Sequence, residues 1–219
     1  MSLSITKEEQ DAMNEKIRLT EEKAEKCNIP NVCENIEDAI VDSDLVLVSG
    51  RFGDSHFKPT LSAISLNKPT YVDKPFTNCF SEAKELVEKA RDNNVPLLSF
   101  SPIQFSSEVI QIRNDINRLG KLTSGVFTGP AYTTSIKGDK AKRLHFYAIH
   151  AVDLMCSFFK EKPCKVNVIQ NQFGVWATIL FNDETHATVN LPFNFDEYYH
   201  CTVYAVSYTH LTLPTSDLV

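Results

Sequence analysis

The stretch Asp44-Leu45-Val46-Leu47-Val48-Ser49-Gly50 decides the fold class of this chain. Its apolar run is typical of a strand that is buried on both faces of a parallel sheet, and the glycine closes the run. Residues 35–41 before it and 55–66 after it have helix-forming patterns, and Thr70-Tyr71-Val72 has the pattern of a second strand. Strands that alternate with helices of this length indicate βαβ units and a parallel sheet.

The alternation extends to both sides of this stretch. Residues 7–27 are rich in Glu, Lys and Ala without Pro or Gly, which predicts a helix. Residues 80–93 carry apolar side chains at helical spacing, and residues 95–100 have the pattern of another strand. We therefore predict an incomplete Rossmann-type parallel α/β domain over residues 1–101.

The second half of the chain has a different pattern. Helices are expected over residues 105–119 and 144–160, and strands over residues 121–128, 165–170, 174–181, 185–191 and from about His200 onward. Neighbouring strands that are joined by short turns form an antiparallel sheet. This pattern predicts an α+β domain with a mainly antiparallel open sheet over residues 102–205, with the boundary near Ser101-Pro102.

The two ends of the chain depart from this organisation. A doubly wound domain normally opens with a strand and a glycine-rich turn, but this sequence opens in a charged helix. None of the seven glycines forms a G-x-G-x-x-G motif. Residues 206–215 closely resemble a translated sequencing-library adapter, although Thr, Leu and Tyr also suit a natural strand. We therefore expect an N-terminally incomplete fragment with a foreign tail over residues 206–219.

Composition excludes several kinds of partner. A net charge of -6 disfavours nucleic acid, because a phosphate backbone requires clustered cations. No apolar run approaches the roughly 20 residues that span a bilayer, and the polar N-terminus is unlike a secretory signal, which favours the cytoplasm and no membrane partner. Six cysteines stand without C-x-x-C or zinc-type His spacing, which predicts free, buried thiols and no metal site.

Tyr71-Val72-Asp73-Lys74-Pro75 carries the clearest chemical signal, because it stands at the carboxyl end of a predicted strand. Ligands of open α/β sheets bind just beyond these ends. A lysine there can bond a substrate hydroxyl or a ribose, a neighbouring carboxylate can tune its charge, and Pro75 restrains the backbone. A surface turn is the alternative interpretation.

Two further segments carry polar side chains at suggestive places. Residues 49–56, Ser-Gly-Arg-Phe-Gly-Asp-Ser-His, follow the preceding strand and form either a cofactor-lining turn or an ordinary strand-to-helix turn. In the helix expected over residues 144–160, His150 and Asp153 are three residues apart and share one face. Histidine exchanges protons near neutral pH, although a lone helical histidine is more often structural.

Together these segments resemble the glucose-fructose oxidoreductase / inositol dehydrogenase (Gfo/Idh/MocA) family, from about Lys23 to Ala205. The resemblance implies a Rossmann domain followed by an α/β domain whose open sheet often mediates oligomerisation, so a homodimer or homotetramer is expected. It implies NAD or NADP as cofactor. It also implies hydride transfer between nicotinamide and a carbon that bears the hydroxyl of a sugar or polyol such as a cyclitol.

The resemblance also implies roles for individual residues. Lys74 corresponds to the lysine of the family's Glu-Lys-Pro motif, with Asp73 in place of Glu, and would orient the substrate hydroxyl and lower its pKa. His150 corresponds to the catalytic histidine, the expected general base. Cofactor contacts are expected from Ser49, Gly50, Arg51, His56, Lys74 and Pro75, and substrate contacts from Tyr147, Asp153 and Gln104.

Three positions depart from the family pattern. Phe146 stands where an Asp four residues before the histidine is usual, Ala148 replaces a usual Gly, and Gln104 replaces a frequent Arg. Tyr147 or His145 could substitute for the missing carboxylate. The expected parent protein is a dehydrogenase, with this chain inactive alone. The alternative is a non-catalytic dinucleotide- or sugar-binding regulator, and a purely structural interaction domain would not explain Asp73-Lys74-Pro75.

Overall fold

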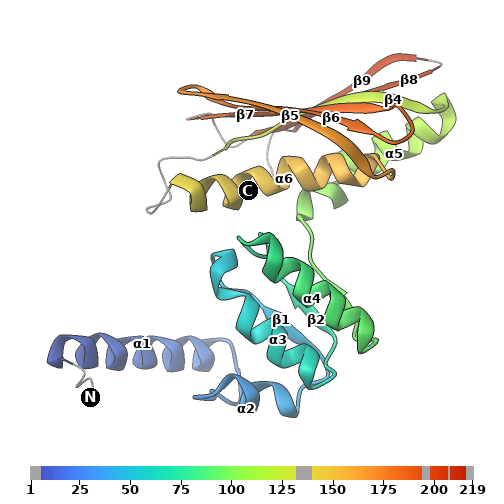
Figure 1. The fold of residues 1–219 in the computed structure, drawn as a ribbon. Coiled ribbons are helices and arrows are strands. Elements are labelled where there is room, and N and C mark those ends of the chain that lie inside the picture. The colour runs from blue at the N-terminus through green and yellow to red at the C-terminus, as the bar shows by residue number, and fades with distance from the viewer. Residues whose placement is uncertain (1–5, 132–139, 194–197, 207, 216–219) are drawn as a thin grey trace.

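The computed structural model of the chain describes residues 6–131, 140–193, 198–206 and 208–215. It contains a smaller domain around a parallel sheet of three strands and a larger domain around a sheet of six strands (Figure 1). The long helix α6 (Lys140–Phe158) lies under the larger sheet, on the side that faces the smaller domain. The two domains therefore meet along α6.

The smaller domain has the βαβ alternation that the sequence predicts. Its elements are α1 (Lys7–Lys26), α2 (Ile36–Val41), β1 (Val46–Val48), the short 3-10 helix η1 (Gly53–Ser55), α3 (Phe57–Ser65), β2 (Thr70–Val72), α4 (Phe80–Asp92) and β3 (Leu97–Leu98). The strands are parallel in the order β1-β2-β3, with Thr70 opposite both Val46 and Leu97. The prediction of a Rossmann-type parallel sheet is confirmed.

Helices α3 and α4 cover one face of this sheet. Val72 is fully buried on that face, and the adjoining small core consists of Ile64, Leu86, Ala90 and Val95. On the other face, Leu47 is 65% exposed. The prediction that the first strand is buried on both faces is therefore wrong, because the Leu47 side chain is not covered by α3 or α4, which pack on the opposite face.

The larger domain begins with η2 (Pro102–Phe105) and α5 (Ser107–Leu119). Its other elements are β4 (Leu122–Thr128), α6, β5 (Pro163–Asn171), β6 (Gly174–Phe181), β7 (His186–Pro192), β8 (Tyr199–Ala205) and β9 (Tyr208–Thr215). The strand order is β5-β6-β7-β4-β8-β9. Every neighbouring pair is antiparallel except β4 and β7, which confirms the mainly antiparallel sheet. Strand β9 lies within the segment expected to be a foreign tail and pairs with β8.

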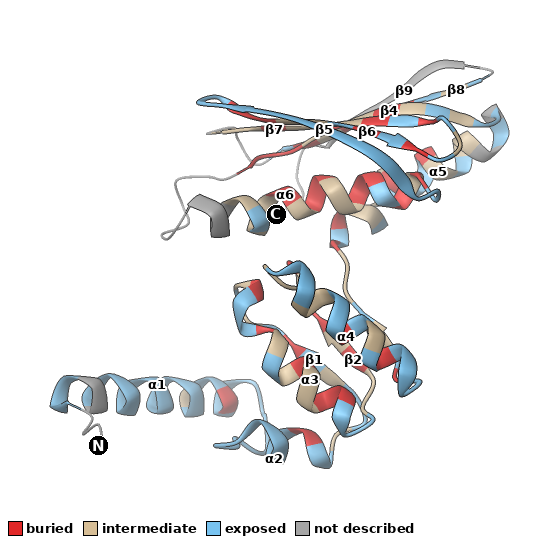
Figure 2. Cartoon of the chain, in the orientation of Figure 1, coloured by how far each residue is buried: buried red, intermediate tan, exposed pale blue. Residues whose placement is uncertain are grey.

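One face of the larger sheet holds the main core. Helices α5 and α6 cover this face (Figure 1 and Figure 2). Alternate residues of β4, β7 and β8 are buried. Phe127 of β4 is fully buried there, with its ring 5.8 Å from that of Phe158 and 6.0 Å from that of Phe159 at the end of α6. These aromatic contacts fix α6 against the sheet and so determine where the polar residues of α6 lie.

Two further expectations concern cysteines and membranes. All six cysteines are free, but only Cys201 is buried, so the expectation of buried thiols is wrong for the other five. They lie on helices, loops and edge positions rather than in the two cores. Among the described residues, no helix combines the length and apolar character needed to cross a membrane.

Candidate active site

Lys74 stands at the carboxyl edge of the parallel sheet, directly opposite α6. Strand β2 ends at Val72, and the backbone N–H of Asp73 donates to the carbonyl of Val48 at the end of β1, at 2.8 Å. The chain then carries Lys74 out of the sheet. The Lys74 ammonium nitrogen lies 3.3 Å from the centroid of the Phe146 ring in α6. Phe146, which stands where the family resemblance leads us to expect an Asp, is therefore the direct neighbour of Lys74.

Phe146 faces a second cation as well. The Arg51 guanidinium, in the turn after β1, lies 5.6 Å from the same ring centroid. An aromatic face attracts cations through its quadrupole, although less strongly than a carboxylate does. Burial lowers the pKa of Lys74, Asp73 acts to raise it, and Arg51 lowers it further. The site thus favours a lysine that gives up its proton more easily than a solvated one.

His150 reaches the same region from the next turn of α6. Its Nδ1 atom lies 2.6 Å from the hydroxyl oxygen of Ser101, and its ring contacts the ring of Tyr199 edge to face at 5.3 Å. Burial, and then the charge of Lys74, lower the pKa of His150 to about 4. His150 is therefore neutral at physiological pH, and it lies close enough to Lys74 to sense the lysine's charge.

Asp153 lies one helical turn beyond His150 and fastens α6 to the segment between the domains. Its Oδ2 atom accepts hydrogen bonds from the Ser101 backbone N–H at 3.1 Å and from the Gln104 side-chain amide at 2.7 Å. Burial raises the pKa of Asp153, while these two bonds and the charge of Arg113 act to lower it. The sequence prediction that His150 and Asp153 share one face is confirmed, and both contact Ser101.

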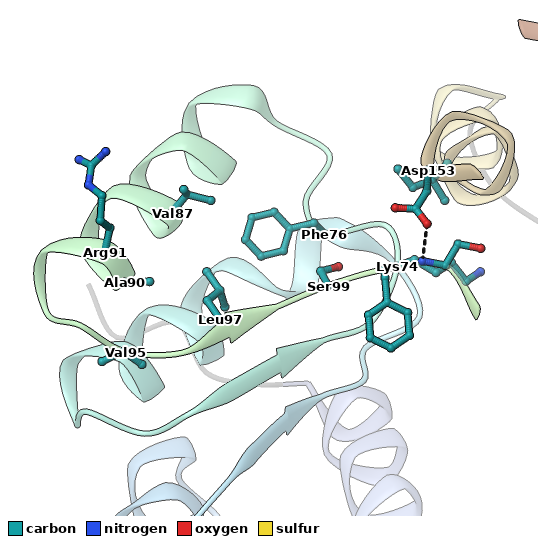
Figure 3. A pocket seen from close by; sticks show the side chains of 12 residues that line it. Lys74, Phe76, Val87, Ala90, Arg91, Val95, Leu97, Ser99 and Asp153 are labelled. Atoms are coloured by element: carbon teal, nitrogen blue, oxygen red, sulfur yellow. Dashed lines mark hydrogen bonds between the residues drawn. The ribbon is translucent and has the colours of Figure 1, made fainter. Parts of the chain in front are cut away.

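Two cavities lie where α6 meets the smaller domain. The first, of about 410 Å³, has Lys74, Ser101 and Asp153 at one end and Arg91 and Val95 at the other (Figure 3). The dashed line in Figure 3 is the hydrogen bond from the Ser101 backbone to Asp153. The second, of about 420 Å³, is mostly apolar and lies between residues 75–83 and α6. Lys74 therefore lines the polar end of the first cavity, and His150 lies behind this end, bonded to Ser101.

His56 was expected to line a cofactor, but it has no exposed surface. Its Nδ1 lies 2.9 Å from the carbonyl of Pro75 and 3.2 Å from that of Phe76, and its Nε2 lies 2.6 Å from the carbonyl of Gly50. Both ring nitrogens of His56 thus face backbone carbonyl groups. We assign His56 to holding the turn after β1 against the turn that carries Lys74.

The other expected cofactor residues lie in these same two turns. Ser49 and Arg51 are exposed, Gly50 is half-buried, and Pro75 is buried with its carbonyl held by His56. A Cβ atom at Gly50 would collide with the Ser55 side chain and crowd the His56 ring at 3.2 Å. A side chain at this position would therefore need the Ser55 hydroxyl to turn away and the His56 ring to shift slightly.

The two remaining residues that were expected to contact the substrate, Gln104 and Tyr147, each pack against a different neighbour. Gln104 is committed to Asp153, and the Tyr147 ring packs edge to face on Phe146 at 5.2 Å. His145, considered as a substitute for the missing carboxylate, is exposed and lines the second cavity instead.

Sequence reasoning missed Ser101, which is fully buried and bonds both His150 and Asp153 of α6. The sequence pointed to Ser101 only as part of a domain boundary, because a serine before a proline indicates a turn and gives no sign of a hydrogen-bond partner on a distant helix. The only usable signal was its position at the end of a predicted strand.

Comparison with known proteins agrees with this geometry. Residues 7–100 match the sequence profile of the oxidoreductase family with an NAD-binding Rossmann fold, GFO_IDH_MocA. No curated protein matches the chain by sequence. The matched residues contain the parallel sheet, both site turns and Lys74.

Solved dehydrogenase structures share the fold of both domains. A levoglucosan dehydrogenase in complex with NADH and levoglucosan has a TM-score of 0.78 at 16% identity, over 90% of this chain and 61% of that one. A myo-inositol dehydrogenase from Lactobacillus casei, in complex with NAD(H) and myo-inositol, has 0.74 at 15%, over 86% and 60%. A dehydrogenase from Chromobacterium violaceum has 0.73 at 20%, over 85% and 59%.

This chain thus spans about three fifths of the length of these relatives. Both its domains take part in the shared fold, and Lys74 and His150 lie where the two domains meet. Residues 7–100 are therefore similar to the oxidoreductase family with an NAD-binding Rossmann fold, and the chain as a whole shares the two-domain fold of these dehydrogenase structures.

Proposed function

We propose that this chain belongs to an NAD(P)-dependent oxidoreductase that moves a hydride between nicotinamide and a carbon bearing a sugar- or cyclitol-like hydroxyl. The observation that carries the proposal is that Lys74, at the carboxyl edge of the parallel sheet, contacts Phe146 of α6, one helical turn before His150. Ligands of open α/β sheets bind at this edge. Lys74 and His150 both have a pKa lowered by burial, as is common at catalytic sites.

The residues present fit one part of a dinucleotide site. Ser49, Gly50 and Arg51 follow β1, and Lys74 and Pro75 follow β2, so both turns border the edge where a ligand would lie. The exposed Arg51 offers a cation for an anionic group. A glycine-rich phosphate turn is not among the 219 residues, so we assign only these contacts to the chain. The bound nicotinamide would supply the hydride chemistry.

The chain's own residues would act on the substrate oxygen. Lys74 points into the space between the domains and can bond that oxygen, while Asp73 tunes its charge. His150 approaches from α6. The Tyr147 ring packs on Phe146, the neighbour of Lys74, and Asp153 and Gln104 orient the segment that carries Ser101. The cation pair of Arg51 and Lys74 around Phe146 would position the polar groups of a substrate.

A sugar or cyclitol substrate is supported by the relatives that hold levoglucosan and myo-inositol. We also propose a homo-oligomer, a cytoplasmic location and no nucleic-acid partner. A structure of similar fold is a biliverdin reductase, at 15% identity and a TM-score of 0.66, so the fold alone does not select the substrate.

The second candidate function is a non-catalytic regulator that binds a dinucleotide or a sugar. Phe146 favours it, because an aromatic ring cannot exchange a proton with His150 or Lys74 as a carboxylate can. The retention of Lys74 and His150 together favours the enzyme.

Turnover with NAD and NADP against a panel of sugars and cyclitols tests the proposal, on this chain and on any longer product of its gene. Lys74→Ala should lower turnover at least 100-fold and weaken NADH binding, followed by ligand-observed NMR, far less, because the contacts assigned to Ser49, Gly50, Arg51 and Pro75 remain. Lys165→Ala removes an exposed lysine of β5 and is the matched control. NADH or sugar binding without turnover in any form would replace the enzyme by the regulator, and absence of both activity and binding would refute both.

A further inference from the structure

Ser101 has a defined set of hydrogen-bond partners that restricts where its proton can lie. The side chain is fully buried. Its Oγ accepts a hydrogen bond from the Ile103 backbone N–H at 3.3 Å and lies 2.6 Å from Nδ1 of His150. A serine hydroxyl has one proton to donate and two lone pairs to accept with.

Nδ1 of His150 is the only acceptor that the described residues offer to this hydroxyl proton. The nearest carboxylate, Asp153, accepts from the Ser101 backbone and from Gln104, and makes no hydrogen bond with the Ser101 hydroxyl. If Nδ1 carried the proton and donated to Oγ, the serine hydroxyl would be buried as a donor without an acceptor, which is unfavourable. The favourable arrangement has Oγ–H donating to an unprotonated Nδ1.

We propose that Ser101 holds neutral His150 in the tautomer protonated at Nε2, so that His150 donates a hydrogen bond to the substrate oxygen and Lys74 is the group that exchanges the proton. Ser101 is a positioning residue in this proposal. The part that concerns the substrate rests on the proposed function, whereas the tautomer does not. The general-base role that the family resemblance suggested for His150 thereby passes to Lys74.

The surroundings of the ring agree with this assignment. Nε2 makes no hydrogen bond to any residue that the structure describes, so its proton is available to a ligand. The ring is held in place by the edge contact with Tyr199 and by Ser101. The charged groups nearby are Lys74, which opposes a second proton on the ring, and Asp153, which is engaged by Ser101 and Gln104.

The proton balance follows from this arrangement. In alcohol oxidation, the substrate hydroxyl would give its proton to Lys74 in its amine form, which burial favours over the ammonium form. A bound oxidised nicotinamide would accept the hydride from the same carbon, so that the C–O bond would become a carbonyl. His150 keeps its Nε2 proton throughout and bonds the oxygen as its charge changes, as a neutral histidine electrophile does. A neutral imidazole held in this tautomer has no lone pair at Nε2 with which to act as a base.

The tautomer is measured directly on the whole chain by long-range ¹H–¹⁵N correlation NMR with ¹⁵N-histidine at pH 7. We expect an unprotonated Nδ1 and a protonated Nε2 for His150, with its signals assigned by their loss in His150→Gln. Ser101→Ala should shift the ring toward the other tautomer or a mixture, and Ser101→Thr should restore the first. The matched control Ser106→Ala removes another serine hydroxyl, the one that accepts from Val109 N–H, and should leave the His150 signals unchanged.

A protonated Nδ1 in the unmodified chain, or His150 signals that do not change in Ser101→Ala, would overturn the proposal. A second measurement tests the role in any form that turns over. His150→Gln keeps a side-chain N–H donor, so it should retain at least tenfold more kcat than His150→Leu. Equal loss in both variants would return the general-base role to His150. If no form turns over, the proposed function fails while the tautomer is still decided by the spectrum.

Discussion

At the scale of single residues, Phe146 forms the contact between the Lys74 ammonium and α6. An aspartate at this position would add a negative charge beside Lys74, whereas the phenyl ring offers only its quadrupole, worth roughly 0.5–2 kcal/mol for a partly desolvated cation. The ammonium nitrogen lies 3.3 Å from the ring centroid, so the ring is in direct contact with the lysine.

This contact predicts opposite effects for two substitutions. Phe146→Asp should raise the pKa of Lys74, because a neighbouring carboxylate favours the ammonium form. Phe146→Leu should lower the pKa of Lys74 further, because burial persists while the ring is lost. Titration of ¹³C-labelled lysine by NMR measures both changes, with Lys74→Met for assignment. Identical titration in both variants would show that residue 146 does not act on Lys74.

His150 gives stability a pH dependence whose sign can be derived. Its folded-state pKa is about 4, against about 6.5 in an unfolded chain. Below pH 6.5 the unfolded state therefore binds a proton that the folded state does not, and the free energy of unfolding falls as the pH falls toward 4. The loss reaches about 3 kcal/mol.

His150→Gln should remove this component. Urea denaturation at several pH values between 7 and 4 should give a flatter dependence for the variant than for the unmodified chain. His145→Gln, at an exposed position in the same helix, is the control and should keep the original slope. The raised pKa of Asp153 acts in the opposite direction and is common to all three proteins. Equal slopes in all three would contradict the assigned burial of His150.

At the scale of elements, α6 determines the site because it belongs to the larger domain yet carries the residues that meet Lys74. Its apolar side packs on the sheet through residues such as Leu154 and Met155, and its polar side bonds Ser101. The 3.6-residue period of a helix separates these two sides. A change in the packing of α6 on the sheet should therefore disturb both stability and the site.

Phe127 is the packing residue that tests this link. Phe127→Ala should reduce the free energy of unfolding by about 3–5 kcal/mol, because the ring is fully buried between β4 and α6. Phe173→Ala removes a ring that is 66% exposed in a turn and should change stability by less than about 0.5 kcal/mol. Urea denaturation of the three proteins measures both effects. A small loss for Phe127→Ala would mean that the two elements separate more easily than their contacts indicate.

At the scale of the whole molecule, both sheets end in strands with exposed apolar side chains. Strand β1 is the edge of the smaller sheet and carries Leu47, and β5 is the edge of the larger sheet and carries Val168 and Ile169, both more than half exposed. Unpaired strand edges with apolar side chains tend to pair with other chains. This arrangement indicates self-association.

We expect the purified chain to form dimers or larger species in sedimentation velocity. Leu47→Lys and Ile169→Lys should each reduce the associated fraction severalfold, because a charge on an edge strand opposes pairing. Ile17→Lys, on the exposed helix α1, adds the same charge away from both edges and is the control. A monodisperse monomer in the unmodified chain would contradict this prediction and the proposed homo-oligomer.

The sequence by itself determined the order and type of the elements. A strand is predicted by apolar side chains at every second position or in a continuous run. A helix is predicted by apolar side chains at helical spacing, such as Leu86 and Ala90. Both patterns depend only on residues that are close along the chain. The predicted helix over residues 80–93 and strand over residues 174–181 therefore agree closely with α4 and β6. The motif Asp73-Lys74-Pro75 was placed at a strand end for the same reason.

Only the tertiary structure decided which side chains meet. The parallel pairing of β4 with β7, the contact of Lys74 with Phe146, and the bond of Ser101 to His150 each join residues far apart in the sequence. Burial is also a tertiary property, so the exposed face of β1 and the low pKa of His150 could not be read from local pattern. Local sequence restricts backbone conformation, whereas distance, desolvation and hydrogen-bond partners arise only when separate elements pack.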